Sequence, residues 1–301
     1  MAFSLKQVIE NAEKNRIAIG HFNISNLEQL KAIATVAKKL NVPVIIGVSE
    51  GEREFIGVLE IVALVKSLKD RGFNIFLNAD HTYGLEGVEK AAKAGFDAVL
   101  FDGGKLPFEE NIKQTKKAVE IAKSINKDIL VEGELGFIGS SSEIRKEIPK
   151  SAAISKEDLA KPEEALKFVD ETGVDLLAPA VGNIHGMLAR QNPPTGGGDG
   201  FAYYDAPLNI SRIEEIKKAT KIPLVLHGGS GSTDKEFQEA IRAGISIIHI
   251  STELRVAWRK GVEEALQKHP DEVAPYKLMP LAMEDMERVV EKKLKLFNKI
   301  S

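Results

Sequence analysis

The stretch NIFLNADHTYGLEGVEKAAKAGFDAVLFD (74–102) decides the fold class. It starts with the apolar run NIFLNA (74–79), passes through a segment of helical spacing, GLEGVEKAAKAG (84–95), and returns to an apolar run, DAVLFD (97–102). Nearly continuous apolar runs are typical of parallel strands that are buried on both faces. Gly95 stands before the second run, where a helix commonly ends. The stretch therefore predicts a strand, a helix and a second, parallel strand.

The same alternation continues on both sides of this stretch. Pro43 and Pro223 open two of the apolar runs, a position at which a strand tolerates a missing N–H. The expected strands are IAIGHF (17–22), PVIIGV (43–48), NIFLNA (74–79), DAVLFD (97–102), DILVEG (128–133), VDLLAPA (174–180), IPLVLHG (222–228) and ISIIHIS (245–251). The expected helices include LEQLKAIATVAKKL (27–40), GLEGVEKAAKAG (84–95), EENIKQTKKAVEIAKSI (109–125) and PEEALKFVDETG (162–173).

Eight strands that alternate with helices predict an α/β fold, the closed (β/α)8 or TIM barrel, with a C-terminal helical extension. A doubly wound open sheet is the alternative. That sheet would need a Gly-rich turn after its first strand, and HFNISN (21–26) is no such turn. The length of 301 residues suits one barrel, so we expect a single domain over 1–301. The Gly- and Pro-rich patch 192–207 is expected to form a mobile loop.

The composition limits the partners of the protein. Its formal net charge of −3 gives no basic excess for nucleic acid, although a small phosphorylated ligand needs only a local cradle. The chain has no cysteine, which excludes disulfides and thiolate metal sites, so a metal would need His, Asp, Glu or water. No membrane span or signal-peptide core is evident, and we expect a cytoplasmic protein without a membrane partner.

Three of the six histidines, His81, His185 and His227, fall at predicted carboxyl ends of strands, where barrel enzymes carry their reactive groups. Neutral imidazole is the commonest ligand of zinc, and catalytic zinc sites often use three protein ligands. Each of these histidines alone could be a core residue or a lone polar tip. The three together favour a metal site. We interpret the others as core or surface residues: His21, His249 and His269.

Carboxylates join the histidines at these strand ends. Asp80 precedes His81, Asp102 ends the fourth strand, and Glu132 and Glu134 end the fifth. A carboxylate after an apolar run needs solvent, a paired charge or a metal. Asp102 could equally be a helix N-cap. Glu132 and Glu134 share one face of a strand, and we expect only one of them to point usefully inward.

Two further segments follow the last two strands. HGGSGST (227–233) and ISTELR (250–255) come after strands seven and eight, the usual phosphate site of barrel enzymes. Successive backbone N–H groups in a glycine loop can hold an anion, although a Gly-Gly-Ser run is as often a simple turn. The position of the first segment, which begins with His227, favours a phosphate cradle.

Taken in order, these motifs resemble the class II, zinc-dependent ketose-bisphosphate aldolases, the group that contains fructose-1,6-bisphosphate and tagatose-1,6-bisphosphate aldolases. The resemblance covers nearly the whole chain. It is carried by FNISNLE (22–28), PVIIGVSEG (43–51), ADHTYG (79–84), DGGKLPFEENI (102–112), VEGELG (131–136), TGVDLLAPAVGNIHG (172–186) and LVLHGGSGS (224–232). None of the predicted strands has an interior lysine, which argues against a Schiff-base route.

The resemblance implies reversible cleavage of a phosphorylated ketose, with fructose 1,6-bisphosphate as first candidate, to dihydroxyacetone phosphate and an aldehyde phosphate through a zinc-stabilised enediolate. His81, His185 and His227 would hold Zn²⁺ or another divalent metal, and Asp80 would be the acid/base. A homodimer or homotetramer is expected from the same resemblance. Also implied are Asp102 and Glu134 at an alternative, more buried metal position, Asn23 and Ser49 at the substrate, and Gly186, Gly228, Gly229, Ser230 and Thr252 at the phosphate and a monovalent cation (Na⁺ or K⁺).

The loop after the fifth strand departs from the family's pattern. It reads FIGSSSEIRKE (137–147), and Ser142 stands at the position of a family glutamate that transfers a proton. Glu143, one residue later, is the candidate to replace it. For the far phosphate, Arg255 and Arg259 are candidates by sequence position alone.

Two other segments also depart from the pattern. His249 replaces a substrate-contacting asparagine, and Ser251 occupies the position that differs between fructose and tagatose enzymes. MLARQ (187–191) lacks a Tyr-Lys pair that the family often has, with Arg190 as the candidate cation. The metal ligands and Asp80 are thus intact while substrate-facing positions are changed, which favours a retained aldol mechanism with an altered sugar.

Two other functions stay open at this point. The first is a non-catalytic relative that binds sugar phosphate or supports a partner aldolase, which the changed loop favours and the complete set of metal ligands opposes. The second is a metal hydrolase on the same barrel. Such hydrolases often carry a His-x-His pair on the first strand, and HFN (21–23) lacks the second histidine.

Overall fold

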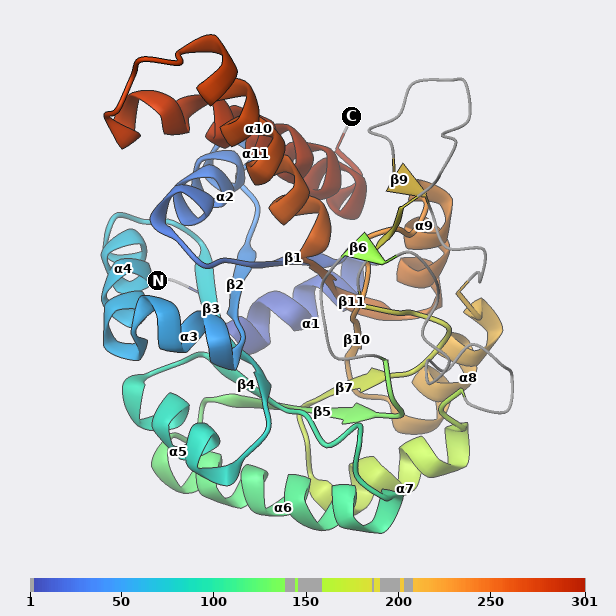
Figure 1. Cartoon of the computed structure of the whole chain (residues 1–301). Helices are drawn as coiled ribbons and strands as arrows, with labels where there is room; N and C mark the ends of the chain where they lie inside the picture. Colours follow the sequence, from blue (N-terminus) through green and yellow to red (C-terminus); the bar gives the residue numbers. More distant parts are fainter. Residues whose placement is uncertain are drawn as a thin grey trace.

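The computed structural model describes residues 3–138, 144–145, 159–185, 187–189, 201–202 and 208–300. Eight parallel strands close into a barrel in the order β1-β11-β10-β7-β5-β4-β3-β2, and helices surround it (Figure 1). The predicted (β/α)8 barrel is therefore confirmed, and the open-sheet alternative is excluded. The barrel strands are β1 (Ile19–Asn23), β2 (Val44–Val48), β3 (Ile75–Thr82), β4 (Ala98–Phe101), β5 (Leu130–Leu135), β7 (Leu176–Pro179), β10 (Leu224–Leu226) and β11 (Ile245–Ile250).

A separate small sheet of three strands in the order β6-β8-β9 has no counterpart in the eight predicted strands. Its members are β6 (Ile144–Arg145), β8 (Met187–Ala189) and β9 (Phe201–Ala202). Apart from β9, the expected loop 192–207 lies outside the described residues. The helices are α1 (Leu5–Asn15), α2 (Leu27–Leu40), α3 (Glu50–Ile56), α4 (Val58–Asp70), α5 (Leu85–Ala94), α6 (Phe108–Ile125), α7 (Pro162–Thr172), α8 (Ile210–Thr220), α9 (Asp234–Ala243), α10 (Thr252–Lys268) and α11 (Pro275–Asn298).

Local signals set the ends of the helices. Helix α2 has the bounds predicted from its spacing. The side chain of Asn26 accepts a hydrogen bond from the Gln29 N–H at its start, and Asn41 ends it in the left-handed conformation. Gly95 ends α5 with φ 94°, a conformation that glycine adopts without the steric cost of a Cβ. These caps turn the chain back toward the next strand.

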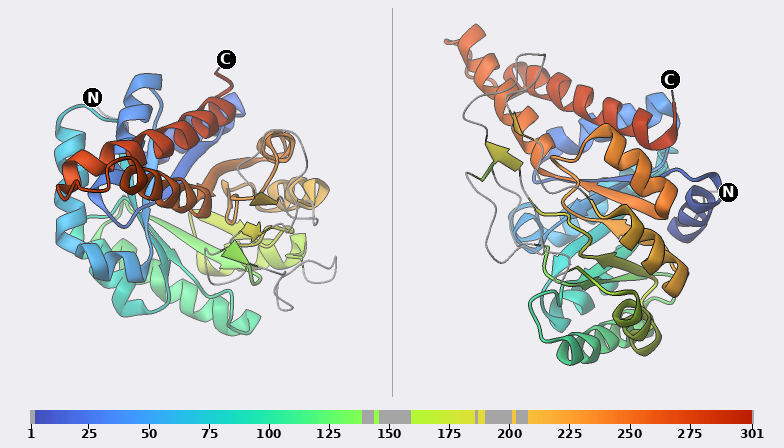
Figure 2. Two further views of the ribbon diagram at one scale, coloured as in Figure 1. Left: turned by 45° about the horizontal axis from the view of Figure 1, so that its top comes forward. Right: turned by 90° about the vertical axis from the view of Figure 1, so that its right-hand side faces the viewer.

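Helix α1 closes the end of the barrel at which the strands begin. Its buried side chains, which include Leu5, Val8 and Ile9, form one apolar cluster with the first inward-facing residues of the strands. Figure 2 (right) shows α1 at one end of the barrel and the short strand β9 at the other. The strand residues of this apolar cluster are Ile19, Ile45, Phe76, Ala98, Leu130, Leu176, Ala178, Val225 and Ile247.

Beyond that apolar layer the interior becomes polar. Side chains alternate between the two faces of a strand, so the residue two positions further on points into the barrel again. On five strands that residue carries a polar side chain, and all five are buried: His21, Asn78, Glu132, His227 and His249. Buried charge must therefore be balanced at the end of the barrel that the carboxyl ends of the strands form.

The C-terminal helices cover one side of the barrel, as Figure 2 (left) shows. Helix α11 packs against α10 and α2, and it buries Met286, Val290 and Leu294 against the main core. The Ala18 N–H donates to the Phe297 carbonyl, which ties the end of α11 to the start of β1. The predicted extension is thus part of the helical layer. Within the described residues, no helix has the length and apolar character to cross a membrane.

We predict that Ile9→Ala lowers the free energy of unfolding by about 2–5 kcal/mol, because it leaves a cavity where α1 plugs the barrel. Ile9 is 2% exposed in that cluster. Denaturant unfolding followed by circular dichroism measures the change. Glu10→Ala, at the next and exposed position, is the control and should stay within about 0.5 kcal/mol of the wild type. Equal stability of the two variants would contradict the role of α1 as a plug.

Candidate active site

A cavity of about 310 Å³ opens at the carboxyl ends of the barrel strands. Its walls come from the ends of β1, β3 and β11, from the loops after β2, β7 and β10, and from the first turns of α3 and α10. The cavity is lined by Asn23, Ser49, Glu50, Gly51, Asp80, His81, Tyr83, His185, Gly228, Ser230, His249, Ser251, Thr252 and Arg255. Most of the site residues expected from the sequence are among them.

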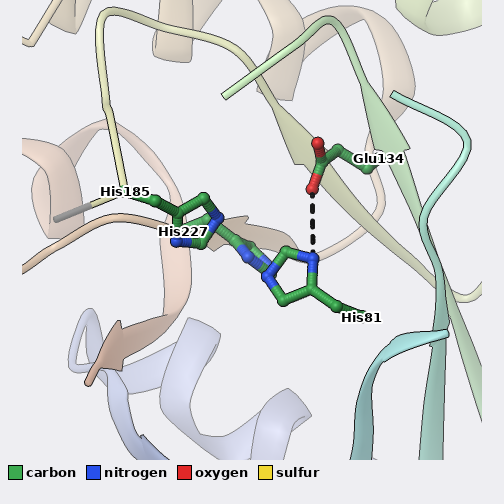
Figure 3. Close-up of side chains that lie close together, drawn as sticks. All are labelled: His81, Glu134, His185 and His227. Atoms are coloured by element: carbon green, nitrogen blue, oxygen red, sulfur yellow. Dashed lines mark ion pairs between the residues drawn. The ribbon is translucent and has the colours of Figure 1, made fainter. Parts of the chain in front are cut away.

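Three histidines from separate strand ends converge beside this cavity. Figure 3 shows the rings of His81, His185 and His227 gathered together, with Glu134 next to His81. The ring centroids lie 4.8 Å (81 to 185), 5.1 Å (81 to 227) and 5.5 Å (185 to 227) apart. Each pair meets edge to face, with interplanar angles of 69°, 83° and 80°. Three steeply inclined imidazoles can point one nitrogen each at a common centre.

Two of these three rings are each hydrogen-bonded to a carboxylate of their own. His81 Nδ1 donates to Asp102 Oδ2 at 2.8 Å, and His227 Nε2 donates to Glu132 Oε1 at 2.7 Å. The remaining nitrogen of His227, Nδ1, is buried, and no described residue forms a hydrogen bond with it. Histidine ligands of metals almost always donate their other N–H to such a group, which fixes the ring and the tautomer. Asp102 is thus no helix N-cap, because α6 starts six residues later and its carboxylate faces His81.

The backbone at His81 has a φ of 40°, a left-handed conformation that a residue with a Cβ rarely adopts. Arg53 fixes the chain around it. Its Nη1 donates to the carbonyls of Val48 (2.6 Å) and Asp80 (2.9 Å), and its Nη2 donates to Thr82 Oγ1 (3.0 Å). This buried guanidinium therefore holds the residues on both sides of His81 in place.

The cluster has more negative charge from carboxylates than positive charge to balance it. Burial raises the pKa of Glu134 well above its usual value, and neighbouring Asp102 raises it further. Burial disfavours the charged form of His81, but Asp80, Asp102 and Glu134 outweigh it and raise the pKa of His81 to about 10. The site therefore attracts positive charge strongly, and a proton on His81 supplies part of it.

The donor set fits a divalent cation. One donor atom each from His81, Glu134, His185 and His227 lies within 4.8 Å of the others. A tetrahedral zinc ion with bonds of 2.0–2.1 Å holds its donors roughly 3.4 Å apart, a spacing that small side-chain shifts reach. Binding of the ion would displace the proton from His81 and balance the surrounding carboxylates.

Asp80 lies next to this cluster at the end of β3. Asn23 Nδ2 donates to its Oδ2 at 2.8 Å, while its Oδ1 is buried and has no hydrogen-bond partner among the residues that the structure describes. Burial opposes ionisation of Asp80, but the charge of His81, helped by the hydrogen bond from Asn23, holds the pKa of Asp80 well below its usual value. Asp80 is therefore an ionised carboxylate with one oxygen available at the cavity.

One expectation from the sequence is wrong here. Glu132 and Glu134 both point inward, and each is 1% exposed. Glu132 is hydrogen-bonded to His227, while Glu134 lies among the three histidines. His249, which the resemblance puts at a substrate-contacting position, lines the cavity with its Nδ1 3.6 Å from Asp80 Oδ1. Tertiary contacts between strands decide both outcomes, and a single strand's pattern does not contain them.

His21 stacks on His249 with centroids 3.4 Å apart and an interplanar angle of 3°. Burial lowers the pKa of both rings, to about 4 for His21, and both are therefore neutral near pH 7. Parallel planes at this spacing cannot both contain one ion. These two rings thus form a neutral platform under Asp80 and do not make a second metal site.

The loops after β10 and β11 both reach the cavity, at the place where the sequence predicts a phosphate cradle. Gly228 has a φ of 61°, and a Cβ there would collide with the Ile184 carbonyl, so this turn requires glycine. Within the described part of the chain, the hydroxyls of Ser251 and Thr252 are buried without hydrogen-bond partners at the start of α10. Ser230 also lines the cavity, whereas the Gly229 N–H donates to the His249 carbonyl. Unpaired hydroxyls and a helix N-terminus suit an anion.

The other predicted residues are divided among three places. Ser49 lines the cavity, where its hydroxyl contacts Glu52 Oε2 at 2.9 Å. Arg255 also lines the cavity and pairs with Glu52 Oε1 at 2.7 Å. Arg259 is 76% exposed and pairs with Glu263. Lying outside the described residues are Ser142, Glu143, Gly186 and Arg190.

Sequence reasoning missed Glu52 and Arg53, although both are buried beside the site. In the sequence they stand in SEGEREF (49–55), which has the charge density of an exposed helix start. The spacing in α3 carries no sign that these two charges face the barrel. Their signal lies only in the fold, which places the start of α3 over the ends of β2 and β3.

Comparison with known proteins agrees with this geometry. The family model described as "Fructose-bisphosphate aldolase class-II" matches residues 3–301. The fructose-bisphosphate aldolase of Staphylococcus aureus is 36% identical over 298 residues, covering 98% of this chain and 96% of that protein. The probable fructose-bisphosphate aldolase of Bacillus subtilis is 34% identical over 299 residues, with coverage of 98% and 96%.

Solved structures show the same fold. The YdjI aldolase from Escherichia coli K12 has a TM-score of 0.77 and 27% identity, covering 99% of this chain and 97% of that one. A putative fructose-1,6-biphosphate aldolase from Coccidioides immitis has a TM-score of 0.80 and 24% identity, with coverage of 99% and 96%. Because the family model matches nearly the whole chain, the chain belongs to the class II fructose-bisphosphate aldolase family and is an aldolase.

Proposed function

We propose that this aldolase reversibly cleaves a ketose bisphosphate, with fructose 1,6-bisphosphate as the first candidate, to dihydroxyacetone phosphate and an aldehyde phosphate. The observation that carries the proposal is the convergence of three features on one cavity. These are the three-histidine cluster, the ionised carboxylate of Asp80, and the cradle of unpaired hydroxyls at the start of α10. The names of the relatives support fructose 1,6-bisphosphate as the first substrate to test.

We propose that His81, His185 and His227 hold a divalent ion, with zinc as first candidate because a three-imidazole set suits it. When bound, the ion supplies positive charge for the enediolate that carbon–carbon cleavage leaves on the ketone half. Asp102 and Glu132 orient two of the rings from behind, at 2.8 Å and 2.7 Å. Glu134, next to His81, is the candidate for an additional ligand.

Asp80 is proposed as the acid/base. In cleavage, the hydroxyl on the departing half must lose its proton as the carbon–carbon bond breaks, and an ionised carboxylate within hydrogen-bond reach can accept it. Asn23 holds Oδ2 of Asp80 at 2.8 Å, which leaves Oδ1 for the substrate. In the reverse direction the same proton returns to the new hydroxyl.

The cradle at Ser230, Ser251 and Thr252 is proposed to bind the phosphate of the ketone half. Phosphate held there would place the carbon chain across the metal centre and next to Asp80, so that binding energy orients the reacting atoms. For the far phosphate, Arg255 is the proposed contact because it lines the cavity and Arg259 does not. Glu52 pairs with Arg255 and would have to share it with that phosphate.

The zinc-loaded wild type is expected to release triose phosphates from fructose 1,6-bisphosphate, and a chelator should stop this release. His185→Ala should lose both bound zinc and cleavage, because it removes one of three converging imidazoles. Metal analysis after dialysis and a coupled triose phosphate assay measure the two effects. The matched control is His269→Ala at an exposed position, which should leave both unchanged. Full activity of His185→Ala would refute the metal assignment.

Asp80→Asn is expected to keep normal zinc content while turnover falls by about 10²–10⁴, the usual share of a general acid/base. The amide has nearly the same shape but cannot take up the proton. Steady-state cleavage kinetics and metal analysis on one protein preparation give both values. Asp271→Asn, at an exposed position, serves as the control. A loss of less than about tenfold would place the acid/base role on another residue.

Glu132→Gln is expected to weaken zinc affinity by about 10- to 100-fold, because His227 loses the carboxylate that orients its ring. Competition with a chromophoric chelator measures the affinity without reference to activity. An exposed residue of α6 provides the control variant Glu120→Gln, which should bind zinc as the wild type does. Unchanged affinity in Glu132→Gln would mean that packing alone positions His227.

A further inference from the structure

Lys293 is a buried lysine near the C-terminal end of α11, with only 3% of the residue exposed. Lysine is almost never buried to this degree unless its charge is paired. Its Nζ lies 2.9 Å from Glu253 Oε1 and 4.7 Å from the centre of the Phe237 ring. Helix α11 thus carries one buried positive charge, which pairs with the carboxylate of Glu253.

That carboxylate adjoins the proposed phosphate cradle. Glu253 is the second residue of α10 and follows Ser251 and Thr252, which line the cavity. Its Oε1 accepts from the Gly231 N–H at 3.3 Å, and its own N–H donates to Ser230 Oγ at 3.3 Å. A single glutamate therefore bridges the two loops that form the cradle.

A negative charge at this place opposes the proposed ligand. Without a counter-charge, the Glu253 carboxylate would repel a phosphate in the adjoining cradle and compete with it for the N–H groups there. The carboxylate is only 18% exposed, so water screens it weakly. Lys293 supplies the missing counter-charge.

We propose that Lys293 is a positioning residue for substrate binding, which acts by neutralising Glu253 and holding it as a bracket between the two cradle loops. The inference rests on the proposed function, since it assumes that the cradle takes a phosphate. Helix α11 thereby becomes part of the ligand site, although the residues that line the cavity beside it belong to α10. Charge on Glu253 then affects phosphate affinity, while the chemistry at Asp80 stays unaffected.

The test uses the full, zinc-loaded chain and titrates dihydroxyacetone phosphate by calorimetry, with steady-state cleavage kinetics alongside. Lys293→Met should weaken binding by about tenfold or more and raise KM, while kcat changes little. Lys292→Met is the matched control one position earlier, where the side chain is 59% exposed and 3.6 Å from Asp234. That control should bind as the wild type does.

Two further variants distinguish an effect of the charge on Glu253 from a loss of local structure. Glu253→Gln should bind dihydroxyacetone phosphate as tightly as the wild type or more tightly, because Lys293 then adds uncompensated positive charge. Lys293→Met combined with Glu253→Gln should return affinity to within about threefold of the wild type. A purely structural bracket would instead weaken binding in both single variants. If Lys293→Met fails to fold, Glu253→Gln and the double variant decide the question.

Wild-type affinity in Lys293→Met, or weakened binding in Glu253→Gln, would overturn the inference. Failure of the proposed function gives a different result, because the wild type itself would then not bind dihydroxyacetone phosphate. In that case the inference falls with it.

Discussion

Burial of carboxylates inside a closed barrel is the constraint on which the rest of this structure depends. Asp80, Asp102, Glu132 and Glu134 stand at the ends of three neighbouring strands, where the barrel leaves them little water. Their charge has to be offset, and the protein offsets it with imidazoles and, as we propose, with a divalent ion. The same carboxylates orient His81 and His227, so charge balance and ligand geometry depend on one set of contacts.

The two ends of the barrel divide stability and chemistry between them. Apolar side chains and α1 fill the end at which the strands begin, and the next residues along the same strands are polar. A rigid apolar layer beneath the site can hold strained features above it, such as the left-handed backbone at His81. Lys293 and Arg53 extend this support outward, because each carries a charge from a surrounding helix to a strand end or cradle loop.

Much of this could be predicted from the sequence, since apolar runs alternating with helical segments have one common closed solution. The position of His81, His185 and His227 at strand ends was enough to expect their convergence. Glu52, Arg53 and Lys293 could not be found in this way, because a buried charge on an amphipathic helix looks like its exposed neighbours until the facing element is known. The pairing of Glu132 with His227 joins residues 95 positions apart, and no local pattern encodes it.

Anomalous X-ray diffraction at the zinc absorption edge would show whether three imidazoles hold a divalent ion beside Asp80. Crystals of the zinc-loaded protein are measured on both sides of the edge. We expect one strong anomalous peak at about 2.0–2.1 Å from nitrogen atoms of His81, His185 and His227. A peak located only at another place, such as the exposed His269, or no peak in protein that cleaves its substrate, would contradict this expectation.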